Sequence, residues 1–144
     1  SNAIVLGDPF DPATQMGPLV SKQQLEKVTG FLSQVRSASD VHLLCGGDTN
    51  FDPTFSGGFY VSPAVVVTDN EAHPIVTDEV FGPVMTVLKF SDETDVVKRA
   101  NSTRLGLAAA VFSQNFSQAH RVANALQAGI VWIKSLGTAV KVGR

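Results

Sequence analysis

The chain has 144 residues, of which 44% are hydrophobic and 17% charged, a balance that excludes disorder and is typical of one globular domain. Its 11 basic and 13 acidic residues give a formal net charge of -2, and no run of Lys or Arg is present, so we expect no nucleic-acid partner. No apolar stretch approaches the roughly 20 residues that cross a bilayer, and the single cysteine forms no internal disulfide, so we expect no membrane partner and a cytoplasmic protein.

The chain opens on residues that do not read as the start of a domain. Ser1, Asn2 and Ala3 resemble the remnant of a cleaved expression tag, so residues 1–3 are set apart from the fold. The following "IVLGDPFDPATQMGP" is rich in Gly, Pro and Asp, a composition typical of connectors between elements. We therefore expect that further sequence belongs upstream.

A helix and a strand come next. Ser21 and Gln24 form a capping-box pattern, and apolar residues then recur at helical spacing, which predicts a helix over 21–37. "VHLLC" at 41–45 is followed by two glycines and predicts a buried strand.

The middle of the chain predicts two further strands around a short turn. "FYVSPAVVV" at 59–67 has strand composition, and Pro63 either places it at a sheet edge or breaks it into two pieces. A short helix or turn is expected over 71–78. "PVMTVLKF" at 83–90 is the clearest strand of the sequence.

From residue 83 onward, strands alternate with helices. The predicted elements are the strand 83–90, a helix capped by Asp92 that runs to about Ser102, a buried strand over 107–113, a helix over 117–128 that is capped by Ser117 and ended by Gly129, and a strand over 130–134. Such alternation implies right-handed crossovers and a mostly parallel sheet with helices on both faces. The predicted class is therefore α/β, with residues 135–144 as a partly loose tail.

The usual catalytic signatures are not found in the sequence. No dinucleotide, P-loop, zinc-protease or nucleophile-elbow motif occurs. Cys45 and His42 lie three residues apart in a predicted strand, so they should point to opposite faces, and Cys45 is expected to be a buried apolar residue. His73 and His120 have no partner at ligand spacing. We therefore predict no metal site and no catalytic residue.

The hexapeptide "DEVFGP" at 78–83 allows two interpretations. In the structural one, Gly82 and Pro83 form a turn, Phe81 packs in the core and the acids are solvated. In the functional one, a carboxylate accepts hydrogen bonds from a sugar diol and the ring offers a face to a flat heterocycle, as a nucleotide cofactor requires. By itself the hexapeptide favours the structural interpretation.

Several landmarks in a fixed order resemble the aldehyde dehydrogenase superfamily. They are "GDPFDPATQMGPLVSKQQLEKV", "LLCGG", "GFYVSPAVVV", "DEVFGPVMTVLKF" and "RANSTRLGLAAAVFSQNFSQAHRVANALQAGIVWI". "LLCGG" and "AHRVANALQAGI" look most similar to the betaine-aldehyde and aminobutyraldehyde branch. The resemblance implies that residues 4–134 are the latter part of a catalytic domain, followed by an unaligned tail over 135–144.

The resemblance also implies roles for individual residues. Glu79 matches the glutamate that hydrogen-bonds the nicotinamide ribose, Phe81 matches the aromatic residue that backs the nicotinamide ring, and Gln24 matches a helix position near the cofactor ribose. The implied cofactor is NAD or NADP. Together these matches outweigh the structural interpretation of Glu79 and Phe81.

The family's reaction uses residues that the match does not include. A cysteine thiolate attacks the aldehyde, a hydride passes to the cofactor, and a glutamate activates water for thioester hydrolysis. Both residues lie upstream of the matched stretch, and the context of Cys45 is unlike that of the nucleophile. We therefore expect a truncated portion of the enzyme that is inactive alone and binds no cofactor tightly.

A second hypothesis is an assembly or binding module that completes a separately encoded half containing the cofactor domain. Surfaces that the longer enzyme buries would be exposed in this chain, and exposed apolar area or free strand edges favour association. We expect a homo-oligomer or a swapped dimer.

Overall fold

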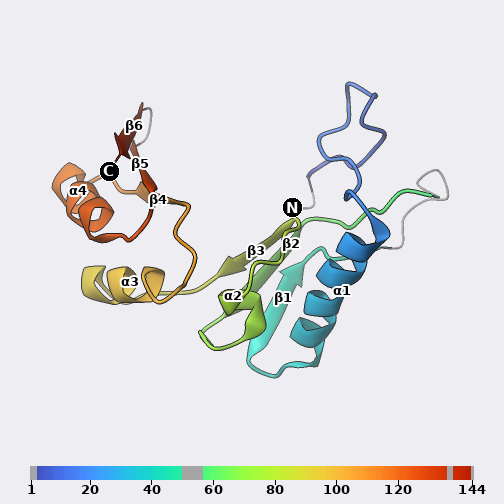
Figure 1. Ribbon diagram of the computed structural model, residues 1–144, viewed down its shortest axis with the longest axis horizontal. Helices are drawn as coiled ribbons and strands as arrows, with labels where there is room; N and C mark the ends of the chain where they lie inside the picture. The colour runs from blue at the N-terminus through green and yellow to red at the C-terminus, as the bar shows by residue number, and fades with distance from the viewer. Residues whose placement is uncertain (1–2, 50–56, 136–137, 144) are drawn as a thin grey trace. The chain divides into compact units, whose positions relative to one another are not determined.

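The computed structural model describes residues 3–49, 57–135 and 138–143. The chain divides into two compact units, Ser1–Lys89 and Phe90–Arg144. Each unit has its own sheet and its own helices (Figure 1). Each also has its own cluster of buried apolar side chains.

The sheet of the first unit contains β1 (Val41–Cys45), β2 (Ala64–Thr68) and β3 (Val84–Val87) in that order. β2 is the central strand; it pairs antiparallel with β1 and parallel with β3. Pro63 lies immediately before β2, so it breaks the predicted strand, and its placement at a sheet edge is wrong. The proline removes one donor, and pairing resumes at Ala64, whose N–H donates to the Pro83 carbonyl at 2.8 Å.

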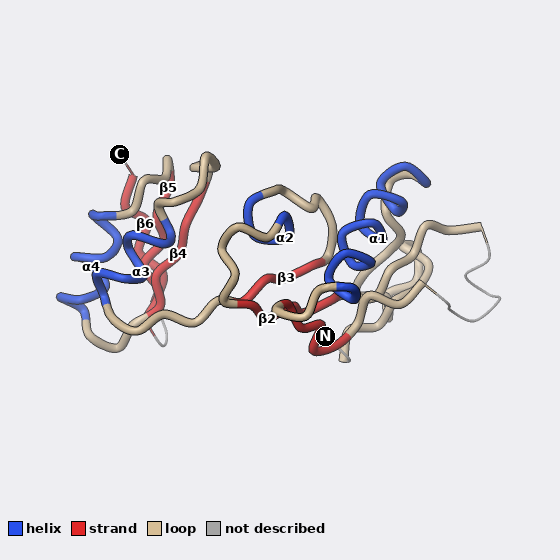
Figure 2. The backbone as a smooth tube through the Cα atoms, turned by 90° about the horizontal axis from the view of Figure 1, so that it is seen from below, coloured by secondary structure: helices blue, strands red, loops and turns tan. Residues whose placement is uncertain are grey.

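Two helices, α1 (Lys22–Ser37) and α2 (Pro74–Thr77), lie on one face of this sheet (Figure 2). Ser21 caps α1 by accepting a hydrogen bond from the Gln24 N–H at 3.2 Å, so the predicted helix is confirmed. The residues of α1 that pack on the sheet repeat at helical spacing and are fully buried: Val28, Leu32 and Val35. They join Val41, Ala64, Val66 and Ile75 in one core.

The opposite face of the first sheet is exposed. Leu44 on β1 and Met85 on β3 are 64% and 57% exposed. β2 alternates between buried and half-buried residues, as expected for a strand with one covered face. Of the two helical layers that the sequence predicts, the described residues therefore supply one.

The second unit contains β4 (Ala108–Phe112), β5 (Ile130–Ser135) and β6 (Thr138–Gly143) in that order. β4 and β5 are parallel and are joined by a helix, which confirms the α/β class; β5 and β6 are antiparallel. β6 lies in the segment that we expected to be partly loose. For residues 138–143 that expectation is wrong, because they form a continuous ladder with residues 130–135; residues 136–137 and 144 lie outside the described ranges.

The helices of the second unit are α3 (Glu93–Ala100) and α4 (Phe116–Ala125). Asp92 caps α3 as predicted, by accepting from the Asp95 N–H at 2.9 Å. The cap of α4 is Asn115 and not Ser117, because the Asn115 side chain reaches the Gln118 N–H at 3.0 Å. Asn115 and Ser117 are both good capping residues, and the hydrogen bond to Gln118 identifies Asn115 as the cap.

The end of α4 also differs from the prediction, which placed it at Gly129. The helix stops at Ala125 because the side chain of Asn101 satisfies its last groups. Asn101 Nδ2 donates to the Ala125 carbonyl at 2.9 Å, and Asn101 Oδ1 accepts from the Gln127 N–H at 2.8 Å. A contact from 24 residues away therefore ends the helix early.

The strand over 107–113 is buried on one face only, in contrast to the prediction. Ala109 and Val111 pack against α4, and the alternate residues of β4 are exposed, with Phe112 72% exposed. A continuous apolar run looked like a strand covered on both sides, but the described residues cover one side.

A bidentate ion pair joins α3 and α4. Arg121 donates from Nε to Oε1 and from Nη2 to Oε2 of Glu93, both at 2.9 Å. These hydrogen bonds lower the pKa of Glu93 and raise the pKa of Arg121.

Replacing Arg121 with Gln should destabilise the second unit at neutral pH and have less effect in acid. A carboxyl whose pKa is lowered by folding contributes stability above its ordinary value of 4.5, and that contribution is lost as pH falls through the lowered pKa. The measurement is urea unfolding at pH 7 and pH 3, followed by the fluorescence of Trp132. The variant K98Q removes an equal charge from α3 without touching this contact; equal behaviour of R121Q and K98Q would refute the role of the pair.

Candidate cofactor site

Residues 79–82 lie across the first turns of α1. Two side chains of the helix donate hydrogen bonds to main-chain carbonyls of this segment. Gln24 Nε2 donates to the carbonyls of Val80 at 3.2 Å and Phe81 at 2.7 Å. Lys27 Nζ donates to the carbonyl of Glu79 at 2.9 Å. The structure therefore brings together all three predicted cofactor-binding residues, Gln24, Glu79 and Phe81.

The geometry of this contact follows from local sequence. Gln24 and Lys27 are three residues apart, so they lie on the same face of α1. Gly82 allows the approach, because a Cβ at that position would lie 2.5 Å from Cγ2 of Val28. Val80 is buried in the core beneath. The segment is thus anchored by one buried side chain and three carbonyls.

Phe81 has a left-handed backbone conformation, with a φ of 58°, and it is the one non-glycine residue with positive φ in the part of the chain that the structure describes. This conformation costs roughly 1–2 kcal/mol for an L-residue. Phe81 is 68% exposed, so the interpretation in which it packs in the core is wrong. A strained backbone that displays an apolar ring to solvent is typical of a binding site.

Glu79 is exposed two residues before this ring. Its carbonyl is held by Lys27, which leaves the carboxylate outside that contact. The arrangement therefore presents an anionic acceptor and an aromatic surface within one short segment, the combination that a ribose joined to a flat heterocycle would use.

Lys27 was not among the residues that the sequence singled out. Besides its bond to Glu79, its ammonium lies 6.0 Å from the centroid of the Phe81 ring, at the limit of a cation–π contact. The sequence could have indicated Lys27, because it lies one helical turn after Gln24 on the same helix.

Elsewhere in the part of the chain that the structure describes, the remaining cysteine and histidines lie apart from one another. Cys45 is half-buried at the end of β1, and His42 is exposed. His73 caps α2 through Nδ1, which accepts from the Ile75 N–H at 3.1 Å, and His120 packs its ring 4.3 Å from that of Phe116. Within the described ranges, no group of three potential metal ligands occurs, and no helix is long and apolar enough to cross a membrane.

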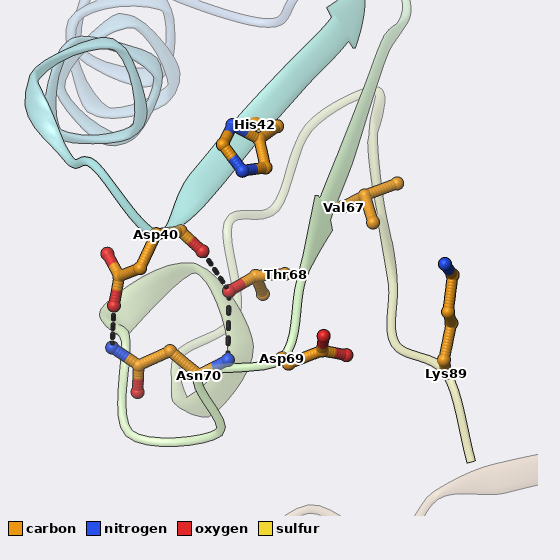
Figure 3. A pocket seen from close by; sticks show the side chains of 7 residues that line it. All are labelled: Asp40, His42, Val67, Thr68, Asp69, Asn70 and Lys89. Carbon is orange, nitrogen blue, oxygen red and sulfur yellow. Dashed lines mark hydrogen bonds between the residues drawn. The ribbon is translucent and has the colours of Figure 1, made fainter. Parts of the chain in front are cut away.

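An open pocket of about 520 Å³ lies at one end of the first sheet (Figure 3). Three of its polar residues bond to one another: Thr68 Oγ1 donates to the Asp40 carbonyl at 2.9 Å, and Asn70 Nδ2 donates to Asp40 Oδ2 at 2.8 Å. The Asn70 N–H in turn donates to Thr68 Oγ1 at 3.0 Å. These bonds tie the loop after α1 to the loop after β2, so we interpret the pocket as a structural junction.

Comparison with known structures places this fold among aldehyde-oxidising enzymes. Betaine aldehyde dehydrogenase from Staphylococcus aureus in complex with NAD+ matches with a TM-score of 0.86 and 34% identity, over 92% of this chain and 26% of that one. A mutant of aldehyde dehydrogenase from Bacillus cereus matches with a TM-score of 0.84 and 39% identity, over the same shares.

Sequence comparison gives the same class. The model of the aldehyde dehydrogenase family matches residues 1–142. Betaine aldehyde dehydrogenases from Mesorhizobium japonicum and Vibrio vulnificus are both 48% identical, over 92% and 93% of this chain. The chain belongs to the aldehyde dehydrogenase family, and it spans 27% of the length of these two relatives.

The strain at Phe81 can be measured with a pair of substitutions. Phe81→Gly and Phe81→Ala both remove the ring, but only glycine adopts positive φ without penalty, so F81G should exceed F81A in free energy of unfolding by about 1 kcal/mol. Urea unfolding followed by circular dichroism gives the difference. At an exposed position with ordinary φ the order would reverse, because glycine has more conformational entropy to lose than alanine; F81A as the more stable variant would therefore rule out the strained backbone.

Proposed function

We propose that the chain is the cofactor-facing part of the catalytic domain of an NAD(P)-dependent aldehyde dehydrogenase, which oxidises an aldehyde to a carboxylic acid. Glu79 accepts hydrogen bonds from the nicotinamide ribose, and Phe81 backs the nicotinamide ring. The single observation that carries this proposal is the Phe81 ring, held exposed by a strained backbone beside an exposed carboxylate.

The residues present fit one end of such a cofactor. A carboxylate can accept from both hydroxyls of a diol, and an uncovered ring gives a flat heterocycle a stacking surface. The cofactor supplies the hydride acceptor of the reaction when it is bound. NAD+ is present in the Staphylococcus aureus relative, and we propose NAD over NADP on that basis.

The substrate that we propose is a betaine-type aldehyde, because the named relatives are betaine aldehyde dehydrogenases. The choice of this branch also agrees with the motifs "LLCGG" and "AHRVANALQAGI". A cytoplasmic location stays a prediction.

Neither Cys45 nor a described histidine is assigned a catalytic role. Cys45 is half-buried on a strand of the first sheet, and the described histidines serve a cap, a ring contact and an exposed position. The resemblance to the family implies that the nucleophilic cysteine and the glutamate base lie upstream of the matched stretch, in a context unlike that of Cys45. We therefore propose that the chain alone does not turn over aldehyde and binds NAD+ weakly.

A chimera tests this function. The chain replaces the matching segment of the Mesorhizobium japonicum enzyme, and NADH formation from betaine aldehyde is followed at 340 nm. We expect activity in the chimera and none in the chain alone. Glu79→Gln should raise the KM for NAD+ about tenfold, since a hydrogen bond to a charged group contributes roughly 1.5–3 kcal/mol.

The matched control is Asp78→Asn, which neutralises the neighbouring carboxylate and should leave the KM for NAD+ unchanged. A folded chimera in which E79Q and D78N behave alike would refute the role of Glu79. Turnover by the chain alone that survives Cys45→Ala would refute its inactivity.

A second candidate function, an assembly module, is favoured by the uncovered sheet faces. Each sheet has helices on one face and exposed apolar side chains on the other: Leu44, Met85 and Val87 in the first unit and Phe112 and Trp132 in the second. Such faces gain free energy when a partner covers them. The partner would be a second copy, in a homo-oligomer or swapped dimer, or a separately encoded half of the enzyme.

Association should depend on these faces. Phe112→Thr keeps a residue with high strand propensity but removes an exposed ring, so it should reduce the mass that light scattering measures at high protein concentration. Val20→Thr is the control, because Val20 is 89% exposed outside both sheets. A monomeric wild-type chain, or equal association of the two variants, would count against this function.

A further inference from the structure

Three successive carbonyls, those of Glu79, Val80 and Phe81, are all bound by side chains of α1. In an ordinary extended segment, successive carbonyls point to alternate sides. Here the left-handed conformation at Phe81 accompanies the turn of all three toward the helix. The main chain of the segment is therefore oriented inward at every residue that the cofactor site uses.

Gln24 and Lys27 are the donors of these three hydrogen bonds. Gln24 Nε2 carries two hydrogens, and its two carbonyl partners use both. Lys27 provides a charge-assisted bond to Glu79, which is stronger than a bond between neutral groups. Gln24 is therefore placed to act on the loop through the main chain, while its predicted contact with a ribose would have to use its oxygen.

Among the residues that the structure describes, the core holds only one side chain of this segment. Val80 is buried, but Glu79 and Phe81 are exposed, so the hydrophobic core does not fix their orientation. Gly82 fits against Val28 and prevents the segment from moving closer to α1. The side-chain donor that the structure places on the Glu79 carbonyl is the ammonium of Lys27.

We propose that Lys27, together with Gln24, is a positioning residue that presets the Glu79–Phe81 loop for the cofactor before the cofactor binds. This inference rests on the proposed function and deepens it. A loop that is ordered in advance loses less conformational entropy on binding, so the cofactor binds more tightly without any contact from the positioning residue.

The test uses the variants K27M, K27R and K22M. K27M keeps the length of the side chain but removes the donor, and K27R restores a cationic donor. K22M is the matched control on the same helix, because Lys22 makes only an exposed pair with Glu26 at 3.6 Å among the described residues. Nitrogen-15 relaxation of the free chain gives the backbone order parameters at Glu79 and Phe81.

In K27M the order parameters at Glu79 and Phe81 should fall from about 0.85 to below about 0.6, the range of a flexible backbone. K27R should recover most of the loss, and K22M should show none. In the chimera, K27M should raise the KM for NAD+ about tenfold with kcat unchanged, as expected for the loss of one charge-assisted hydrogen bond.

Each other outcome overturns the proposal in a recognisable way. Unchanged order parameters in K27M refute the positioning role; if the KM still rises, Lys27 acts by direct contact instead. A mobile loop with an unchanged KM shows that order in the loop does not help binding. If E79Q itself leaves the KM unchanged, the proposed function fails, whereas the relaxation data still decide whether Lys27 orders the loop.

Discussion

The close approach of residues 79–82 to α1 is the constraint on which the first unit depends. Gly82 lies against Val28, and Val80 enters the core. Phe81, between these two residues, has positive φ. Core packing and the display of Phe81 are thus two results of one contact. The stability of the unit and the geometry of its cofactor-facing loop cannot be changed independently, since both depend on the same turn of helix.

The two sheets have the strand pairing of the family's fold, and each has one exposed face. Parallel pairing between β2 and β3 and between β4 and β5 is the pattern of an α/β catalytic domain. Such sheets are normally buried on both faces, yet here one face of each is exposed among the described residues. The chain spans 27% of the length of its two named relatives, so these exposed faces are those of this part of the family fold alone.

Local signals predicted most of the elements, and distant contacts explain the differences. The capping box at Ser21 and the spacing of Val28, Leu32 and Val35 located α1, since both act within one helix. The end of α4 was misplaced because Asn101, far away in sequence, binds it. At the site, the family landmarks indicated Glu79 and Phe81, but the backbone conformation at Phe81 and the bond from Lys27 depend on how the loop meets the helix, which no local pattern encodes.

The strand order has a consequence for how the chain folds. In both sheets every strand pairs with its neighbour in sequence, and each unit closes its core from its own residues. Contacts between segments that are close in sequence form quickly, because little loop entropy is lost before they are made. During synthesis β1, β2 and β3 can therefore pair as soon as β3 leaves the ribosome, while the second unit is still being translated.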